Sequence, residues 1–129
     1  MAWMLVALGG ALGAVSRYAL TGWVQTLTGG TFPWGTMTVN VLGSLLLGFA
    51  MAWLQTAALS ADVRRFAAIG LLGSFTTFST FSYEAAALLR DGEWGAAGGY
   101  VLGSLGAGLL AVGVGYALAT SLVLTGSRG

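Results

Sequence analysis

Long stretches without a charged side chain constrain the fold of this chain more than any other feature. No Asp, Glu, Lys or Arg occurs between Arg17 and Asp62, or between Glu93 and Arg128. Only 7% of the residues are charged, against about 25% in soluble proteins, and the mean hydropathy is +0.85. A helix that spans a bilayer needs about 20 mainly apolar residues. The chain is therefore predicted to be an all-α integral membrane protein.

Turn signals divide the chain into four predicted transmembrane helices, within a single integral membrane domain of residues 1–129. The spans are expected at about 2–25, 33–55, 62–89 and 93–124. Gly29-Gly30 marks the first connection, and Asp91-Gly92-Glu93 marks the last. The opening residues carry no basic segment, which favours a retained first helix over a cleaved signal peptide. Cysteine and histidine are absent, which removes disulfides and the commonest transition-metal ligands.

The arginines indicate only a weak preference for one orientation in the membrane. Four spans place both termini on one side, together with Arg64, Arg65 and Arg128. Arg17 and Arg90 lie toward the other side. Orientation follows the Lys/Arg difference between short connections, so three arginines against two leave two hypotheses open. One is a single topology fixed by Arg64 and Arg65, and the other is insertion in both orientations followed by antiparallel pairing.

Glycine is abundant, with 22 residues, and several glycines are four residues apart, as Gly9 and Gly13 are. Small residues at this spacing let membrane helices approach closely. Tight packing within one chain would account for most of them. Four short helices nevertheless leave little material to enclose a pore and also face lipid, so we expect at least a homodimer.

Hydroxyl and phenyl side chains alternate over residues 73–84, inside the third span. This stretch reads Gly-Ser-Phe-Thr-Thr-Phe-Ser-Thr-Phe-Ser-Tyr-Glu, with no charge before Glu84. Small polar side chains are costly at membrane depth unless they line a cavity, face another helix or bind a ligand. Gly73, Thr76 and Thr77 are weak helix formers, so we expect a local break in the helix. A break would free backbone carbonyls, which a cation or a facing helix could satisfy.

The polar and aromatic residues of the second and third spans could together line an anion path. Hydroxyl and amide N–H groups donate hydrogen bonds to an anion, and the edges of aromatic rings carry positive potential. Phe78 and Phe81 share one face of a helix, and Asn40 follows Thr36 by one turn. Such a lining suits a small, hard anion that sheds water without being trapped by a full charge. The alternative is that the rings only pack and the hydroxyls bond back to their own helix.

Three spans supply a polar or charged side chain at comparable depth, toward the side opposite the termini. These residues are Arg17, Asn40 and Glu84. Two interpretations remain open: a structural salt bridge with an asparagine that links helices, or a polar vestibule.

Four segments of the sequence resemble the Fluc/CrcB family of fluoride channels. Residues 73–84 are similar to the family's third-helix signature, residues 9–18 to its first-helix motif and residues 35–44 to its second. Residues 100–104 lie where the family places a tyrosine and a serine on the fourth helix. The resemblance covers nearly the whole chain, and the motifs occur in the family's order.

The resemblance implies an antiparallel, dual-topology homodimer in the lipid bilayer, with two fluoride pores and a structural Na⁺ at its centre. Arg17 and Glu84 would lie in the vestibules, and the backbone carbonyls of Gly73 and Thr76 would bind the Na⁺. The resemblance also implies passive fluoride efflux that lowers cytoplasmic fluoride, through a multi-pass protein of the cell inner (plasma) membrane. The implied fluoride pore residues are Asn40, Phe78, Ser79, Thr80, Phe81, Tyr100 and Ser104.

Two other functions remain as alternatives. A small proton-coupled exporter can also use four short helices, but such carriers rely on a carboxylate in the first span, where this chain has none. A non-transporting membrane scaffold subunit would use the glycines and hydroxyls for packing alone. An enzyme is not expected, because histidine, cysteine and paired carboxylates at membrane depth are missing. The net charge of +1 gives no indication of nucleic-acid binding.

Overall fold

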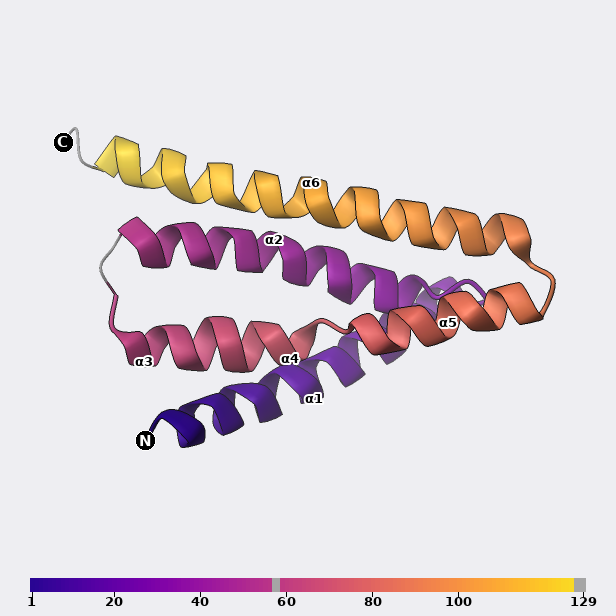
Figure 1. Cartoon of the computed structure of the whole chain (residues 1–129), viewed down its shortest axis with the longest axis horizontal. Coiled ribbons are helices and arrows are strands. Elements are labelled where there is room, and N and C mark those ends of the chain that lie inside the picture. Colours follow the sequence, from indigo (N-terminus) through magenta and orange to yellow (C-terminus); the bar gives the residue numbers. More distant parts are fainter. Residues whose placement is uncertain (57–58, 127–129) are drawn as a thin grey trace.

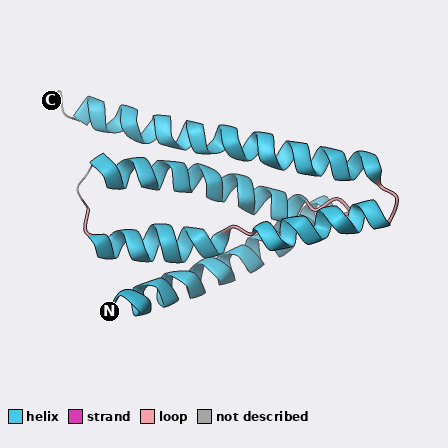
Figure 2. Ribbon diagram, viewed as in Figure 1, coloured by secondary structure: helices cyan, strands magenta, loops and turns pink. Residues whose placement is uncertain are grey.

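The computed structural model describes residues 1–56 and 59–126, which form a bundle of helices (Figures 1 and 2). Arg128, which contributes to the charge comparison above, lies outside the described residues. Three helices are long and apolar enough to cross a membrane. They are α1 (Ala2–Thr28), α2 (Trp34–Thr56) and α6 (Trp94–Gly126). The chain is therefore an all-α, multi-pass membrane protein.

The segment between α2 and α6 is a helical rod with an interruption in its middle. Thr76 and Thr77 form the interruption, with φ/ψ of −89°/159° and −149°/119°, which is extended backbone. The interruption lies where weak helix formers predicted a break. The rod consists of α3 (Ala61–Val63), the π-helix η1 (Arg64–Leu72), α4 (Gly73–Phe75) and α5 (Phe78–Arg90).

The wide π-helical turn of η1 is not expected from the sequence. Its residues are mainly Ala, Ile, Leu and Gly, which carry no signal that separates a π-helix from an α-helix. π-Helical turns are rare in proteins, and those that occur are often found at functional sites. Here η1 precedes α4 and the interruption directly.

The helices pack as two pairs, one formed by α2 and α6 and the other by α1 and the first half of the interrupted rod. Helices α2 and α6 lie side by side, and α1 lies against η1 and α4 (Figure 1). The first residue of α1 and the last turn of α6 lie at the same end of the bundle. A buried apolar cluster joins α5 to α6 and contains Phe81, Ala85, Leu88, Ala97 and Tyr100.

Gln25 fixes the connection between α1 and α2. Its Nε2 donates to the carbonyl oxygens of Gly30 and Phe32 at 3.2 and 3.1 Å, and its Oε1 accepts from the backbone N–H of Gly35 at 3.3 Å. Gly29 and Gly30 have φ of +65° and +73°, which glycine adopts without strain. The end of α1 is thereby held against the start of α2.

Glycines allow α1 to lie directly on η1. A Cβ added at Gly13 would overlap the carbonyl oxygen of Leu71, and one added at Gly9 would overlap the carbonyl oxygen of Phe66. Only a residue without a side chain permits this approach of two backbones. Gly9 and Gly13 therefore pack within one chain.

Gly13→Ala is expected to destabilise the fold by about 1–3 kcal/mol, because α1 must move away from η1 to make room for the methyl group. Gly95→Ala is the matched control, since a Cβ at that helical glycine meets no atom within 4 Å. Thermal unfolding of the detergent-solubilised protein measures both. Equal midpoints for Gly13→Ala and the wild type would contradict the close packing of α1 on η1.

Candidate ion pathway

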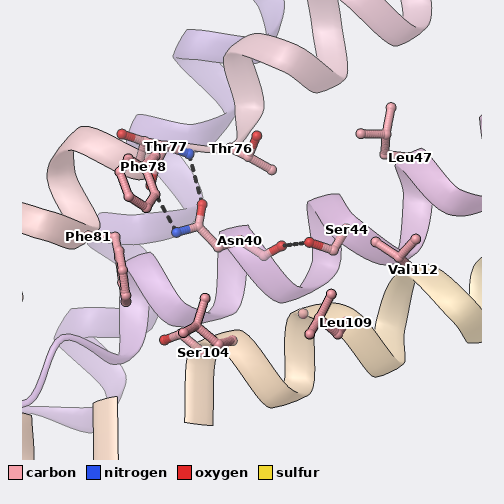
Figure 3. A pocket seen from close by; sticks show the side chains of 12 residues that line it. Asn40, Ser44, Leu47, Thr76, Thr77, Phe78, Phe81, Ser104, Leu109 and Val112 are labelled. Atoms are coloured by element: carbon pink, nitrogen blue, oxygen red, sulfur yellow. Dashed lines mark hydrogen bonds between the residues drawn. The ribbon is translucent and has the colours of Figure 1, made fainter. Parts of the chain in front are cut away.

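A cavity of about 320 Å³ lies where α2 and α6 face the interruption of the rod (Figure 3). We refer to it as the asparagine cavity. Its lining combines Asn40 and several hydroxyls with phenyl and aliphatic side chains, and it includes no charged residue. The lining residues are Asn40, Ser44, Leu47, Thr76, Thr77, Phe78, Phe81, Ser104, Leu105, Gly108, Leu109 and Val112.

The side chain of Asn40 holds the interruption open. Its Nδ2 donates to the carbonyl oxygen of Thr77 at 3.0 Å, and its Oδ1 accepts from the backbone N–H of Thr77 at 2.8 Å (Figure 3). In a continuous α-helix the N–H of Thr77 would instead donate to the carbonyl of Gly73. One carboxamide on α2 therefore satisfies both backbone groups of an extended residue at membrane depth.

Thr77 also caps the start of α5. Its Oγ1 accepts from the backbone N–H of Thr80 at 3.2 Å and donates to the Oγ1 of Thr80 at 3.0 Å. In a continuous helix the N–H of Thr80 would donate to the carbonyl of Thr76. The carbonyls of Gly73 and Thr76 both lose their helical donors in this way. They are the same two carbonyls for which the family resemblance implies a cation.

The two phenylalanines of the cavity differ in their surroundings. Their ring centroids are 5.8 Å apart. Phe78 is 77% exposed in the single chain, whereas Phe81 is 9% exposed and packs on Tyr100 with ring centroids 5.1 Å apart. Phe81 therefore supports the core as well as the cavity, and Phe78 faces outward from the chain.

Ser104 presents a buried hydroxyl to the same cavity. Its Oγ has no hydrogen-bond partner among the residues that the structure describes. Buried polar atoms are nearly always paired with protein, water or a ligand. The hydroxyl is thus available to a molecule or ion inside the asparagine cavity.

Four of the seven predicted pore residues line the asparagine cavity: Asn40, Phe78, Phe81 and Ser104. The other three lie elsewhere. Ser79 is exposed, with its Oγ 3.4 Å from the Oγ1 of Thr77. Thr80 lines a neighbouring cavity. Tyr100 is fully buried, and its hydroxyl donates to Glu84 Oε2 at 2.8 Å.

The salt-bridge interpretation of Arg17 and Glu84 is wrong. The two carboxylate oxygens of Glu84 accept from the hydroxyls of Thr36 and Tyr100, at 2.9 and 2.8 Å. Among the described residues the ion pair is Arg65–Asp62, at 2.8 Å. Glu84 is satisfied by two hydroxyls on α2 and α6, whereas Arg17 faces a separate cavity against α1. Asn40 does link helices, as the other part of that interpretation predicted.

A second cavity adjoins the asparagine cavity, and a third adjoins the second. The arginine cavity, of about 550 Å³, lies along α1 and shares Thr77 with the asparagine cavity. The carboxylate cavity, of about 220 Å³, contains Glu84 and Asp91. The lining of the arginine cavity is Ala14, Arg17, Tyr18, Ala19, Thr21, Gly22, Trp23, Thr36, Thr77 and Thr80. Thr21 and Thr36 line both of these cavities, which connects all three through shared residues.

Sequence reasoning missed Thr21 and Gln25. Thr21 follows Arg17 by four residues, so the two share a face of α1, and that spacing was a readable signal. Gln25 lies one turn further on the same face. Nothing in the sequence indicates that Gln25 binds the backbone of the next connection, because that contact depends on the path of the chain after α1.

Comparisons with known proteins agree with the motifs. The family described as "CrcB-like protein, Camphor Resistance (CrcB)" matches residues 4–116. Proteins named fluoride-specific ion channel FluC are similar over most of their length. One from a strain of Thermus thermophilus is 52% identical over 121 residues, which cover 94% of this chain and 95% of that protein. Another, from Opitutus terrae, is 49% identical over 123 residues, covering 93% of each. The chain therefore belongs to the CrcB family.

Proposed function

We propose that this protein is a fluoride-selective ion channel that conducts F⁻ passively. The observation that carries the proposal is the lining of the asparagine cavity, which offers hydrogen-bond donors and phenyl rings but no charged side chain. Relatives at about half identity over nearly the whole chain are named fluoride channels. Its function is conduction rather than catalysis.

The cavity can replace part of the water shell of a small anion. The Asn40 amide has two N–H donors, of which one binds Thr77, so one remains. The unpartnered hydroxyl of Ser104 supplies a second donor. The edges of Phe78 and Phe81 supply positive potential. Because none of these groups is an ion, binding is favourable without being tight, as conduction requires.

The working unit is proposed to be an antiparallel, dual-topology homodimer. In the single chain Gly73, Phe78 and Ser79 are exposed at the interruption of the rod. Irregular backbone at membrane depth is tolerated where protein or a water-filled cavity covers it. A second, inverted copy would cover this face and would complete two pores. The interrupted rod then acts as the fourth membrane crossing, beside α1, α2 and α6.

A structural Na⁺ is proposed at the centre of that dimer. The carbonyls of Gly73 and Thr76 fit a hard cation, because both are oxygen ligands and both have lost their helical donors. Two carbonyls from each copy would make four oxygens without a carboxylate. The bound ion would supply fixed positive charge near the pores and hold the copies together.

Replacing Na⁺ with N-methyl-D-glucamine is expected to lower fluoride flux and to shift the protein from dimer toward monomer, because four carbonyl oxygens would face one another without a cation. Fluoride efflux and size-exclusion chromatography measure the two effects, and restoring Na⁺ should reverse both. A stable dimer with full flux after rigorous removal of Na⁺ would refute this site.

Fluoride efflux from liposomes tests the proposed function directly. Purified protein is reconstituted, a K⁺ ionophore starts the flux, and a fluoride electrode records release. Rapid fluoride release with little chloride release in a parallel experiment is the expected result. If folded, reconstituted protein released no fluoride, the residues of the asparagine cavity would serve only in packing, and the scaffold alternative would be favoured.

The proposed location is the inner (plasma) membrane, where a passive path would drain fluoride from the cytoplasm. Weakly acidic HF crosses membranes and dissociates inside a cell. The membrane potential would then drive F⁻ outward through the channel. This role requires no energy source beyond the membrane potential.

A further inference from the structure

A separate pocket of about 320 Å³ lies between the end of α2 and the start of the interrupted rod. We refer to it as the α2–α3 pocket. It shares no lining residue with the asparagine, arginine and carboxylate cavities. Its volume falls within the roughly 300–1,000 Å³ that is usual for small-molecule sites. The lining residues are Met51, Leu54, Gln55, Leu59, Ala61 and Arg64.

The length of α2 places this pocket at the edge of the hydrocarbon layer. The helix has 23 residues, or about 34 Å at 1.5 Å per residue, and the hydrocarbon core of a bilayer is about 30 Å thick. Trp34 and Trp53, in the first and last turns of α2, are both exposed, as aromatic residues at the two membrane surfaces usually are. The end of α2 and the start of α3 therefore lie at the depth of phospholipid headgroups (Figure 1).

The pocket combines an apolar surface with exposed polar groups. Met51, Leu54 and Leu59 supply the apolar surface. Gln55 and Arg64 supply an amide and a guanidinium, and both residues are exposed. A phospholipid has the same combination, because its hydrocarbon chains begin directly below a charged phosphate. The lining therefore suits a lipid better than a wholly polar or wholly apolar ligand.

The charge of Arg64 is not neutralised by the described part of the chain. Asp62 is the nearest acidic residue in the sequence, and it pairs with Arg65 at 2.8 Å instead. Arg64 has no ionic partner among the described residues, and no carboxylate lines the pocket. A guanidinium can donate two parallel hydrogen bonds to a phosphate group. Arg64 is thus available to the phosphate of a lipid headgroup.

We propose that the α2–α3 pocket binds one anionic phospholipid, with its phosphate on Arg64 and an acyl chain along Met51, Leu54 and Leu59. The amide of Gln55 supplies a further donor to the headgroup. A headgroup with net negative charge is preferred, because it gives the unpaired guanidinium a counter-ion that a zwitterionic headgroup already carries within itself. This site is independent of the proposed channel function. In the proposed antiparallel dimer, each leaflet would hold one such lipid, because the two copies are inverted.

Native mass spectrometry of the detergent-purified protein tests the site. Phosphatidylglycerol and phosphatidylcholine with the same acyl chains are added in parallel, and the lipid-bound fraction is compared. The wild type should retain more phosphatidylglycerol, and Arg64→Gln should lower its affinity for that lipid about fivefold. Phosphatidylglycerol should also raise the thermal unfolding midpoint of the wild type more than that of Arg64→Gln, because a ligand of the folded state stabilises it.

Arg90→Gln is the matched control, because it makes the same change in charge at the other end of the bundle. Arg90 is exposed in the last turn of α5, lies over the ring of Tyr83 and lines none of these pockets. It should retain the wild-type preference for phosphatidylglycerol. An equal loss in Arg64→Gln and Arg90→Gln would indicate attraction by overall charge alone and would overturn the proposal.

Two other results would also overturn the lipid site. One is a preference for phosphatidylglycerol that Arg64→Gln leaves unchanged, since the guanidinium would then only extend into water. The other is loss of bound phosphatidylglycerol when excess inorganic phosphate is added at constant ionic strength. That result would identify a site for free phosphate, in which the apolar lining of Met51, Leu54 and Leu59 has no part.

Discussion

Phe78→Ile should remove most fluoride conduction while leaving the protein folded. Phe78 lines the asparagine cavity and is 77% exposed in the single chain, so its ring contributes little to packing within the chain. Isoleucine keeps apolar bulk but lacks the positive ring edge that faces an anion. We expect the rate of efflux per channel to fall about tenfold or more, which corresponds to about 1.4 kcal/mol in the barrier. The liposome assay measures this, with the elution profile as the check on folding.

Two further substitutions test whether the loss of flux is specific to the ring of Phe78. Phe66→Ile is the matched control, because Phe66 is half-buried on η1 and lines none of the three cavities. It should conduct as the wild type does. Phe81→Ile should lower both flux and thermal stability, because Phe81 packs on Tyr100 in the buried cluster. Wild-type flux in Phe78→Ile would mean that the ring is not part of the fluoride path.

Asn40→Asp is expected to abolish flux and to destabilise the fold by about 1–3 kcal/mol. The new carboxylate can still accept from the N–H of Thr77, but it cannot donate to the carbonyl of Thr77. That carbonyl loses its partner and faces a negative oxygen instead. The substitution also places negative charge in a cavity that otherwise lacks charge. Efflux and thermal unfolding measure the two effects.

Thr38→Val is the matched control for Asn40→Asp. Thr38 lies on α2, two residues before Asn40, but lines a different, mainly apolar cavity between α2 and α6. It should leave flux and stability close to the wild type. If Asn40→Asp kept the wild-type flux and midpoint, Asn40 would neither hold the interruption nor line the path.

Much of this protein can be predicted from its sequence, because lipid allows few solutions. Uncharged runs of about 20 residues in a chain this apolar must form membrane helices. The weak helix formers at Gly73, Thr76 and Thr77 predicted the interruption, which the structure places at Thr76 and Thr77. Residues three or four apart share a helix face whatever the helix packs against. That rule brought Phe78 and Phe81 together correctly.

The residues that depend on contacts between helices could not be predicted in the same way. A link from Asn40 to another helix belonged to one of the two interpretations that the sequence left open. The sequence did not identify Thr77 as the partner of Asn40, and it left Glu84 open to Arg17. Two hydroxyls on other helices bind Glu84 instead, and Arg17 is left to a cavity of donors. Sequence determines which side chains share a face of one helix, because the helical repeat is local. Which faces meet is decided by close packing between segments far apart in the chain, such as Thr21 on Gly35, and only the tertiary structure contains that information.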